Sequence, residues 1–277
     1  MIRWLVCLLL TLVLAGCSAT FAYNQLDWLI PWYVDDYVDL SRDQKQFLKG
    51  EIEPILQWHR EEELVRYIAI LDQVESDLVA PVTAETVHNW IDQVVEAGER
   101  IEDSMLKVAL EFSSQLSDEQ MQEFVASMWK KQEEYEEEYL PRSEEEYIEE
   151  NAENLEEFLR RFTGRLSTEQ QQRLQLAAAS MQRFDAIWLE DHNDWLETLV
   201  PLLQRPEGWQ EAVLVAHANR PANRSLQYQQ TLEYNLNVVT HAGADVLNDM
   251  SDKQRKHMAD EIDSLRKKIR KLTGSQG

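Results

Sequence analysis

The residue types in this sequence with most scope for acid–base or metal chemistry are its histidines and carboxylates. The six histidines are scattered along the chain: His59, His88, His192, His217, His241 and His257. None of them belongs to a His-Glu-x-x-His motif, and the sequence contains neither a Gly-rich phosphate loop nor a Gly-x-Ser-x-Gly elbow. The pattern therefore favours a protein without a catalytic centre.

Two short stretches have the spacing of partial metal sites. The run from Glu190 to Asp194 places His192 among carboxylates, but consecutive helical residues point in different directions, so the run needs a ligand from another helix. Glu85 and His88 have the spacing of half a di-iron site, and no second copy occurs. We predict no metal site and no enzymatic activity. A metal-dependent hydrolase or oxidase, using carboxylates with His88 or His192, is the alternative.

Cys17 is the residue for which the sequence predicts a covalent modification. Arg3 begins a leader whose apolar run is too short to span a bilayer as a helix. The end of this run resembles the lipobox of bacterial lipoproteins: Leu14, Ala15, Gly16 and Cys17. The resemblance implies that residues 1–16 are a cleaved signal peptide and that Cys17 carries diacylglycerol and acyl chains. An ordinary cleaved signal peptide or a buried apolar segment is the alternative.

The residues after the cysteine bear on where the protein lies. In lipoproteins that this segment resembles, a residue other than aspartate after the cysteine implies export to the outer membrane, and here that residue is Ser18. Residues 17–22 form a tether of under ~20 Å at about 3.5 Å per residue. Each buried methylene contributes about 0.8 kcal/mol, so several acyl chains would hold the protein almost permanently. We expect the folded part to lie at the periplasmic leaflet of the outer membrane.

The net charge and the cysteine count exclude several classes of protein. The formal charge of −24 becomes −25 when Arg3 is removed, which argues against a nucleic-acid partner and against attraction to anionic lipid. Of the two cysteines, Cys7 would leave with the signal peptide and Cys17 would carry lipid. The mature chain would then have neither a disulfide nor a cysteine-type zinc site.

The composition predicts an all-α fold, because glycine and proline are few and alternating β-branched runs are missing. We expect an elongated bundle of about eight to nine helices, several long and kinked, in one domain over residues 23–277. The first long helix should cover residues 41–78, with a kink at Gly50 and Pro54. The others should cover residues 83–112, 143–164, 167–195, 207–218, 223–248 and 252–272.

Aromatic residues crowd into the positions that follow the tether, and the central candidates are Trp28, Trp32, Tyr33 and Tyr37. One interpretation is an aromatic belt at the headgroup level of the membrane. The other is core filling, which is favoured because acidic residues that disfavour insertion stand among them: Asp27, Asp35, Asp36 and Asp39.

Opposite charges concentrate in two segments. Residues 133–157 contain thirteen glutamates and a single arginine, whereas residues 251–277 contain eight lysines and arginines against four acidic residues. We expect the basic helix 252–272 to dock on the acidic segment, within one molecule or between two. The apolar stripe that would supply most of the stability consists of Met258, Ile262, Leu265 and Ile269.

A pentapeptide occurs four times: Leu40–Gln44, Leu116–Gln120, Leu166–Gln170 and Met250–Gln254. Its serine and glutamine, three residues apart, are typical of a capping box that begins a helix. The copies suggest a duplication that pairs residue 41 with 167 and 117 with 251, and hence two related halves, 23–140 and 141–277. The pentapeptide resembles the Leu-Thr-x-x-Gln motif of small helical periplasmic stress chaperones, although serine replaces threonine throughout.

A broader resemblance covers nearly the whole chain. It includes the lipobox, Tyr23-Asn24, Asp27-Trp28-Leu29, the run from Val34 to Leu40, and Trp58-His59-Arg60. These segments are similar to an uncharacterised family of bacterial lipoproteins, defined as a domain of unknown function. The resemblance implies no established activity. We expect a lipid-anchored module that binds an envelope protein or another envelope component without catalysis, and a chaperone for unfolded envelope proteins is a further alternative.

Overall fold

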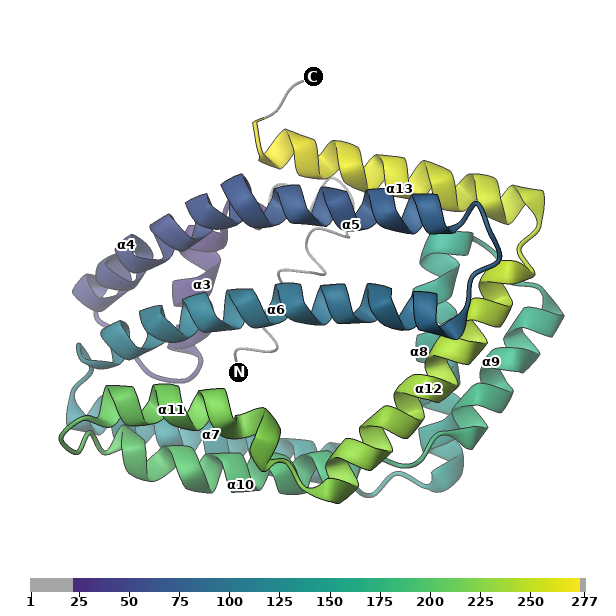
Figure 1. Cartoon of the computed structure of the whole chain (residues 1–277). Coiled ribbons are helices and arrows are strands. Elements are labelled where there is room, and N and C mark those ends of the chain that lie inside the picture. Colours follow the sequence, from purple (N-terminus) through teal and green to yellow (C-terminus); the bar gives the residue numbers. More distant parts are fainter. Residues whose placement is uncertain (1–21, 275–277) are drawn as a thin grey trace. The chain divides into compact units, whose positions relative to one another are not determined.

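The computed structural model describes residues 22–274, and the all-α class is confirmed: every regular element in this range is a helix (Figure 1). The signal peptide, the lipobox and Cys17 lie outside the described residues, as does the tether before residue 22. The helices are α3 (Leu26–Asp35), α4 (Arg42–Trp58), η1 (His59–Glu63), α5 (Leu64–Asp77), α6 (Ala84–Ser113), α7 (Asp118–Tyr139), α8 (Glu144–Thr163), α9 (Thr168–Ser180), α10 (Asp185–Leu203), α11 (Trp209–Asn223), α12 (Leu226–Asn248) and α13 (Asp252–Leu272).

The serine-led helix starts are confirmed. In five helices the N-cap serine side chain accepts a hydrogen bond from the third helical residue's amide, and that residue's side chain accepts one from the serine amide: Ser41, Ser117, Ser143, Ser167 and Ser251. Each capping box satisfies two amides that have no partner within the helix. Local sequence alone is therefore enough to begin these helices.

The helix expected from Ser167 through Trp195 is wrong in one respect, because it breaks after Ser180. Met181 adopts an extended conformation. The Gln182 amide donates to Asn235 Oδ1, and Asn235 Nδ2 donates back to the Gln182 carbonyl, both at 2.8 Å. A side chain of α12 thus takes the place of the helical hydrogen bonds. This break adds a helix, so the described part has ten helical runs, with α4, η1 and α5 counted as one, instead of eight to nine.

The interruption of the first long helix also differs from the expectation. Residues 42–77 are continuously helical through Gly50 and Pro54, and the change in hydrogen-bond pattern falls later, at the π-helical η1. His59 and Glu63, at the two ends of η1, are both buried. The Tyr23 hydroxyl is hydrogen-bonded to His59 Nδ1 at 2.7 Å, so the π-helical turn begins at a buried polar contact.

The chain divides into two compact units, each built from three separate segments. Unit 1 comprises the described part of Met1–His59 together with Glu99–Pro141 and Phe184–Gln229, and unit 2 comprises the intervening segments and residues 230–274. Three of the boundaries between these segments fall inside helical elements, namely η1, α6 and α12. The units therefore interleave along the chain and do not coincide with the halves 23–140 and 141–277, whose relationship stays a prediction.

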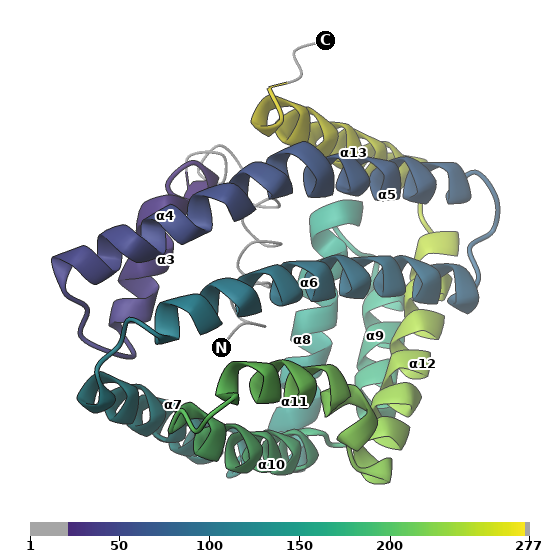
Figure 2. The ribbon, with the colours of Figure 1, turned by 60° about the vertical axis from the view of Figure 1, so that its left-hand side comes forward.

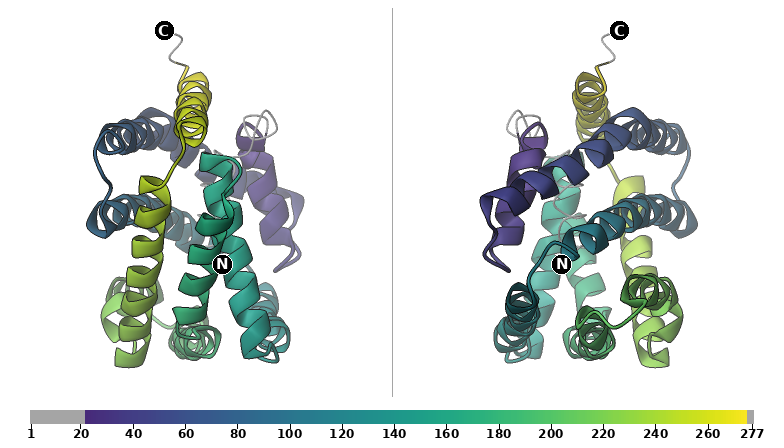
Figure 3. Two further views of the ribbon diagram at one scale, coloured as in Figure 1. Left: turned by 90° about the vertical axis from the view of Figure 1, so that its right-hand side faces the viewer. Right: turned by 90° about the vertical axis from the view of Figure 1, so that its left-hand side faces the viewer.

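Within unit 1, α3 packs against α4, and α10 packs against both α7 and α11 (Figure 2). Its largest fully buried side chains are Tyr23, Leu26, Ile52, Ile101, Leu196 and Tyr228. Within unit 2, α13 packs against α5 and α8, and α8 packs against α9 (Figure 3). One of its apolar clusters joins Val82, Ala244, Leu247, Met250, Met258 and Ile262.

The last helix docks through the predicted apolar stripe but has different ionic partners. Met258, Ile262, Leu265 and Ile269 are all buried. Arg266 bonds to Asp72 at 2.9 Å and to Glu75 at 2.6 Å, both on α5. α8, which begins within the predicted acidic segment, contacts α13 as well. Arg266 is thus paired with α5, and charge pairing between the basic helix and residues 133–157 stays a prediction.

Candidate functional site

The first candidate surface is the outward side of α3, which we call the tryptophan face and define as Trp28 and Trp32. These side chains are 60% and 55% exposed. They lie four residues apart and therefore on one side of the helix. Leu26 and Ile30, on the opposite side of α3, are buried in unit 1, and Pro31 is buried as well. Helix α3 thus has apolar side chains on both its inner and its outer surface.

The two tyrosines of the same segment are placed differently. Tyr37 is buried, its ring centroid lies 6.2 Å from that of Phe124, and its hydroxyl is 3.0 Å from that of Tyr33. Burial, together with the hydrogen bond to Tyr33, raises the pKa of Tyr37. The structure therefore divides the four predicted aromatics: Tyr37 belongs to the core, Tyr33 is half-buried, and the tryptophans lie at the surface.

Two of the four neighbouring acidic residues are neutralised by lysines of α4. Lys49 Nζ lies 2.8 Å from Asp27 Oδ2, and Lys45 Nζ lies 2.8 Å from Asp35 Oδ2. Asp35 also accepts a hydrogen bond from the Leu40 amide at 3.0 Å. The bond from Lys45, reinforced by that from Leu40, lowers the pKa of Asp35. These ion pairs weaken the electrostatic argument against contact between α3 and a membrane.

The second candidate is the run from Glu190 to Asp194 on α10, and its side chains diverge to different partners. Asp191 forms ion pairs with Arg220 at 3.4 Å and with Arg224 at 4.0 Å. His192, the next residue, is hydrogen-bonded through Nδ1 to Gln132 Oε1 on α7. The carboxylate and the imidazole therefore hold two different neighbours of α10 and do not converge.

Gln132 completes this second arrangement and was not predicted from sequence. Its Nε2 donates to the Leu189 carbonyl at 3.1 Å and to Asn193 Oδ1 at 2.8 Å. The His192 ring stacks on Trp188 with centroids 4.9 Å apart. Gln132 is buried although it stands between charged residues, Lys131 and Glu133, and nothing in the local sequence distinguishes it. The α10 network is therefore a structural junction between α7, α10 and α11.

Other predicted ligands stay apart as well. His88 lies 3.5 Å from Asp92, one turn along α6, and both side chains are exposed. Across residues 22–274 no three histidine, cysteine, aspartate or glutamate side chains come together in a way that could hold a metal ion. The geometry shown by the described residues thus offers no ready coordination sphere.

The third candidate is a groove between α9 and α12 in unit 2, with a volume of about 510 Å³. Its walls include Leu176, which is 72% exposed, and Tyr234, which is 43% exposed. The two helices run antiparallel, because Arg173 reaches the Asp245 carbonyl while Gln182 meets Asn235. Small or apolar side chains line the space between them: Ala177, Val238 and Ala242. Sequence periodicity predicts that these apolar side chains share a helix face, but it does not tell whether that face is exposed or buried in the core.

The structure also bears on how the chain could meet a membrane. Between residues 22 and 274, no helix combines the length and the apolar character needed to cross a bilayer.

Comparison with known proteins assigns the chain to a family. Residues 36–229, which make up most of the sequence, match the Family of unknown function (DUF6279). Neither the curated proteins nor the solved structures include a match to this chain. The match covers α4 to α11. It therefore includes the serine–glutamine caps at Ser41, Ser117 and Ser167 and the α10 network. The protein belongs to the DUF6279 family.

Proposed function

We propose that this protein is a lipid-anchored module of the bacterial cell envelope that binds a partner protein and catalyses no reaction. Cys17 carries the lipid and holds the protein at the periplasmic leaflet of the outer membrane. The lipobox segment in the sequence supports the anchor.

The observation that supports a binding role is the α9/α12 groove. Leu176 and Tyr234 present apolar surface to solvent there. By contrast, the best candidates for chemistry already have partners: Asp191 forms an ion pair with Arg220, and His192 is hydrogen-bonded to α7. Exposed apolar surface in a concave site is typical of protein recognition. A binding module therefore accounts for the available surfaces better than a hydrolase does.

The shape of the groove fits an amphipathic helix of a partner. Two antiparallel helices with small side chains between them, such as Ala177 and Ala242, leave room for the apolar row of a third helix. Arg173, at one end, is paired with Asp249 at 3.3 Å and marks a polar limit to the apolar stretch. We expect the bound helix to place two or three apolar side chains between Leu176 and Tyr234.

The anchoring part of the proposal is tested with Cys17→Ser. Labelled fatty acid should enter the parent protein in cells and not the variant, and the variant should leave the membrane fraction without a change in its circular dichroism spectrum. Equal labelling of the two proteins would show that Cys17 is not lipidated.

The binding part is tested by a photo-crosslinking residue placed at Leu176 and, as the matched control, at Val79, which is also exposed and belongs to unit 2. A discrete adduct should form from position 176 only. It should disappear when Asn237→Trp fills the groove, provided that this variant melts like the parent. Adducts that survive this filling, or that form equally from position 79, would contradict the groove as the binding surface.

A further inference from the structure

We propose that the tryptophan face of α3 lies in the headgroup region of the membrane that holds the protein. This inference rests on the membrane anchoring in the proposed function and adds a second contact to it. The protein would then be held by a lipid on Cys17 and by an interfacial helix.

The first argument is the exposure of this pair in comparison with the other tryptophans. Among the tryptophans of residues 22–274, only Trp28 and Trp32 are exposed, and the rest are buried or half-buried. Tryptophan favours the interface between water and the acyl chains, because its ring is apolar and its indole N–H can still find a partner. Two such side chains on one side of a short helix are better accommodated in headgroups than in water.

The second argument is reach. The chain between Cys17 and residue 22 extends at most ~20 Å, at about 3.5 Å per residue. Trp28 is the third residue of α3, which begins only four residues after residue 22. The tryptophan face therefore follows the predicted lipid so closely that it cannot be far from the bilayer surface.

The third argument is charge. Asp27 and Asp35, which flank the tryptophans in sequence, are paired with Lys49 and Lys45 at 2.8 Å. Asp36 is exposed at the C-terminal end of α3 and follows Trp28 by about 12 Å along the helix, at 1.5 Å per residue. We expect Trp28 to lie deeper in the interface than Trp32, because Trp32 is only one turn from this carboxylate.

The fourth argument is rigidity. Leu26 and Ile30 fix the inner side of α3, and Lys45 and Lys49 bind it to α4. The tryptophans therefore cannot turn inward without disrupting buried contacts. A rigidly held interfacial helix would set the orientation of unit 1 on the membrane, which a flexible lipid tether alone could not do.

The experiment uses the chain from Cys17 onward, purified without lipid. Because Cys7 lies in the predicted leader, Cys17 is the one cysteine of this chain and can be coupled to a maleimide lipid in phosphatidylcholine vesicles. Nitroxide-labelled lipids then report the depth of the tryptophans by quenching their fluorescence. The parent is compared with Trp28→Phe/Trp32→Phe and with Val79→Ala, which removes an exposed apolar side chain from unit 2 as the matched control.

A nitroxide near the headgroup should quench the coupled parent and Val79→Ala strongly, and a nitroxide near the chain end should quench them less. The double variant should lose most of this quenching, and Trp28→Phe alone should lose more than Trp32→Phe alone. Equal quenching of the parent and the double variant, or no quenching of the coupled parent, would overturn the proposal. The tryptophan face would then be a candidate surface for binding a protein partner. Because the coupling is chemical, the result does not depend on whether cells lipidate Cys17, which the fatty-acid labelling tests separately.

Discussion

Gln44 and Gln120 join the starts of two helices by exchanging side-chain hydrogen bonds. Gln44 Nε2 donates to Gln120 Oε1 at 2.8 Å, and Gln120 Nε2 donates back to Gln44 Oε1 at 2.9 Å. The same amides also donate across the pair to main-chain carbonyls, Gln44 to Gln115 at 2.9 Å and Gln120 to Asp39 at 2.7 Å. Each glutamine thus caps its own helix and holds the segment before the other one.

Unit 2 repeats this arrangement with Gln170 and Gln254. Gln254 Nε2 donates to Gln170 Oε1 at 2.8 Å and to the Arg165 carbonyl at 3.2 Å, while Gln170 Nε2 donates to the Asp249 carbonyl at 3.3 Å. In both units the carbonyl belongs to the residue two positions before the serine cap. The two glutamine pairs therefore have the same geometry, while the duplication that pairs residue 41 with 167 and 117 with 251 stays a prediction.

The first prediction concerns the relative stability of the two glutamine pairs. Gln170→Ala should lower the free energy of unfolding by about 2 kcal/mol, because it removes a cap and leaves buried carbonyls without donors. Gln44→Ala should cost about 1 kcal/mol, because its surroundings are open to water that can replace the lost bonds. Urea unfolding of both variants, beside Gln73→Ala on an exposed helix surface, measures the difference. Equal losses of unfolding free energy in Gln170→Ala and Gln73→Ala would contradict this prediction.

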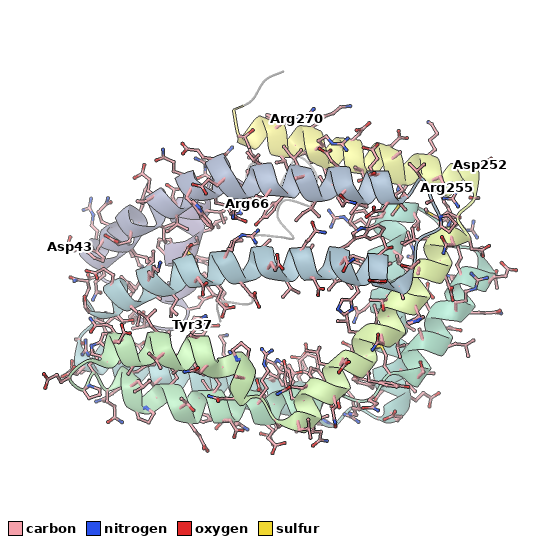
Figure 4. The ribbon with its side chains drawn as sticks, viewed as in Figure 1. Tyr37, Asp43, Arg66, Asp252, Arg255 and Arg270 are labelled. Carbon is pink, nitrogen blue, oxygen red and sulfur yellow. The ribbon has the colours of Figure 1, made fainter. Side chains whose placement is uncertain are left out.

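The second prediction concerns Arg266, whose guanidinium contacts Asp72, Glu75 and Asp263. Arg266→Met should destabilise the protein by about 2 kcal/mol, because charge-assisted bonds between α13 and α5 are lost. Arg270→Met is the matched control: Arg270 is exposed and projects outward from α13 (Figure 4), so its loss should cost less than about 0.5 kcal/mol. Thermal melts of the two variants make the comparison. The prediction is wrong if both melt like the parent.

The third prediction concerns the apolar stripe of α13. Leu265→Ala should cost about 2 to 4 kcal/mol, because the side chain is almost fully buried and its truncation leaves a cavity.

Deleting residues 252–277 should destabilise unit 2 further. Hydrogen exchange should show protection of the α13 amides in the parent and faster exchange in α5 and α8 after the deletion. Free exchange of the parent's α13 amides would instead identify this helix as an independent arm.

The fourth prediction is a pH dependence at Asp35. Its pKa in the folded protein lies below the ordinary value of 3.8, so its stabilising contribution is present above that pH and is lost as the pH falls through the folded-state pKa. Asp35→Asn should therefore cost about 1 kcal/mol at pH 7, and the difference from the parent should shrink below pH ~4. Unfolding free energies across this range measure it, with Asp43→Asn, another acidic side chain at the start of α4, as the control. A difference that stays constant with pH would refute the role of the ion pair.

The candidate surfaces could be predicted only in part. The aromatic segment is evident from composition, but Tyr37 and Trp32 are similar in type and near in sequence. Tertiary packing, which places Phe124 beside Tyr37, decides which ring is covered. The histidine–carboxylate run on α10 was found from residue types. Its partners, Gln132 and Arg220, come from other helices and have no local signature.

The sequence by itself determined the all-α class, the serine-capped starts of five helices and the apolar stripe of α13, because each depends on residues within one or two helical turns. Only the tertiary structure decided the break after Ser180, the ion pairs of Asp27 and Asp35, and the exposure of Trp28 and Leu176. These features depend on side chains and surfaces that distant segments supply. A helix can encode its own beginning, but whether an outward residue is covered depends on what the rest of the chain places against it.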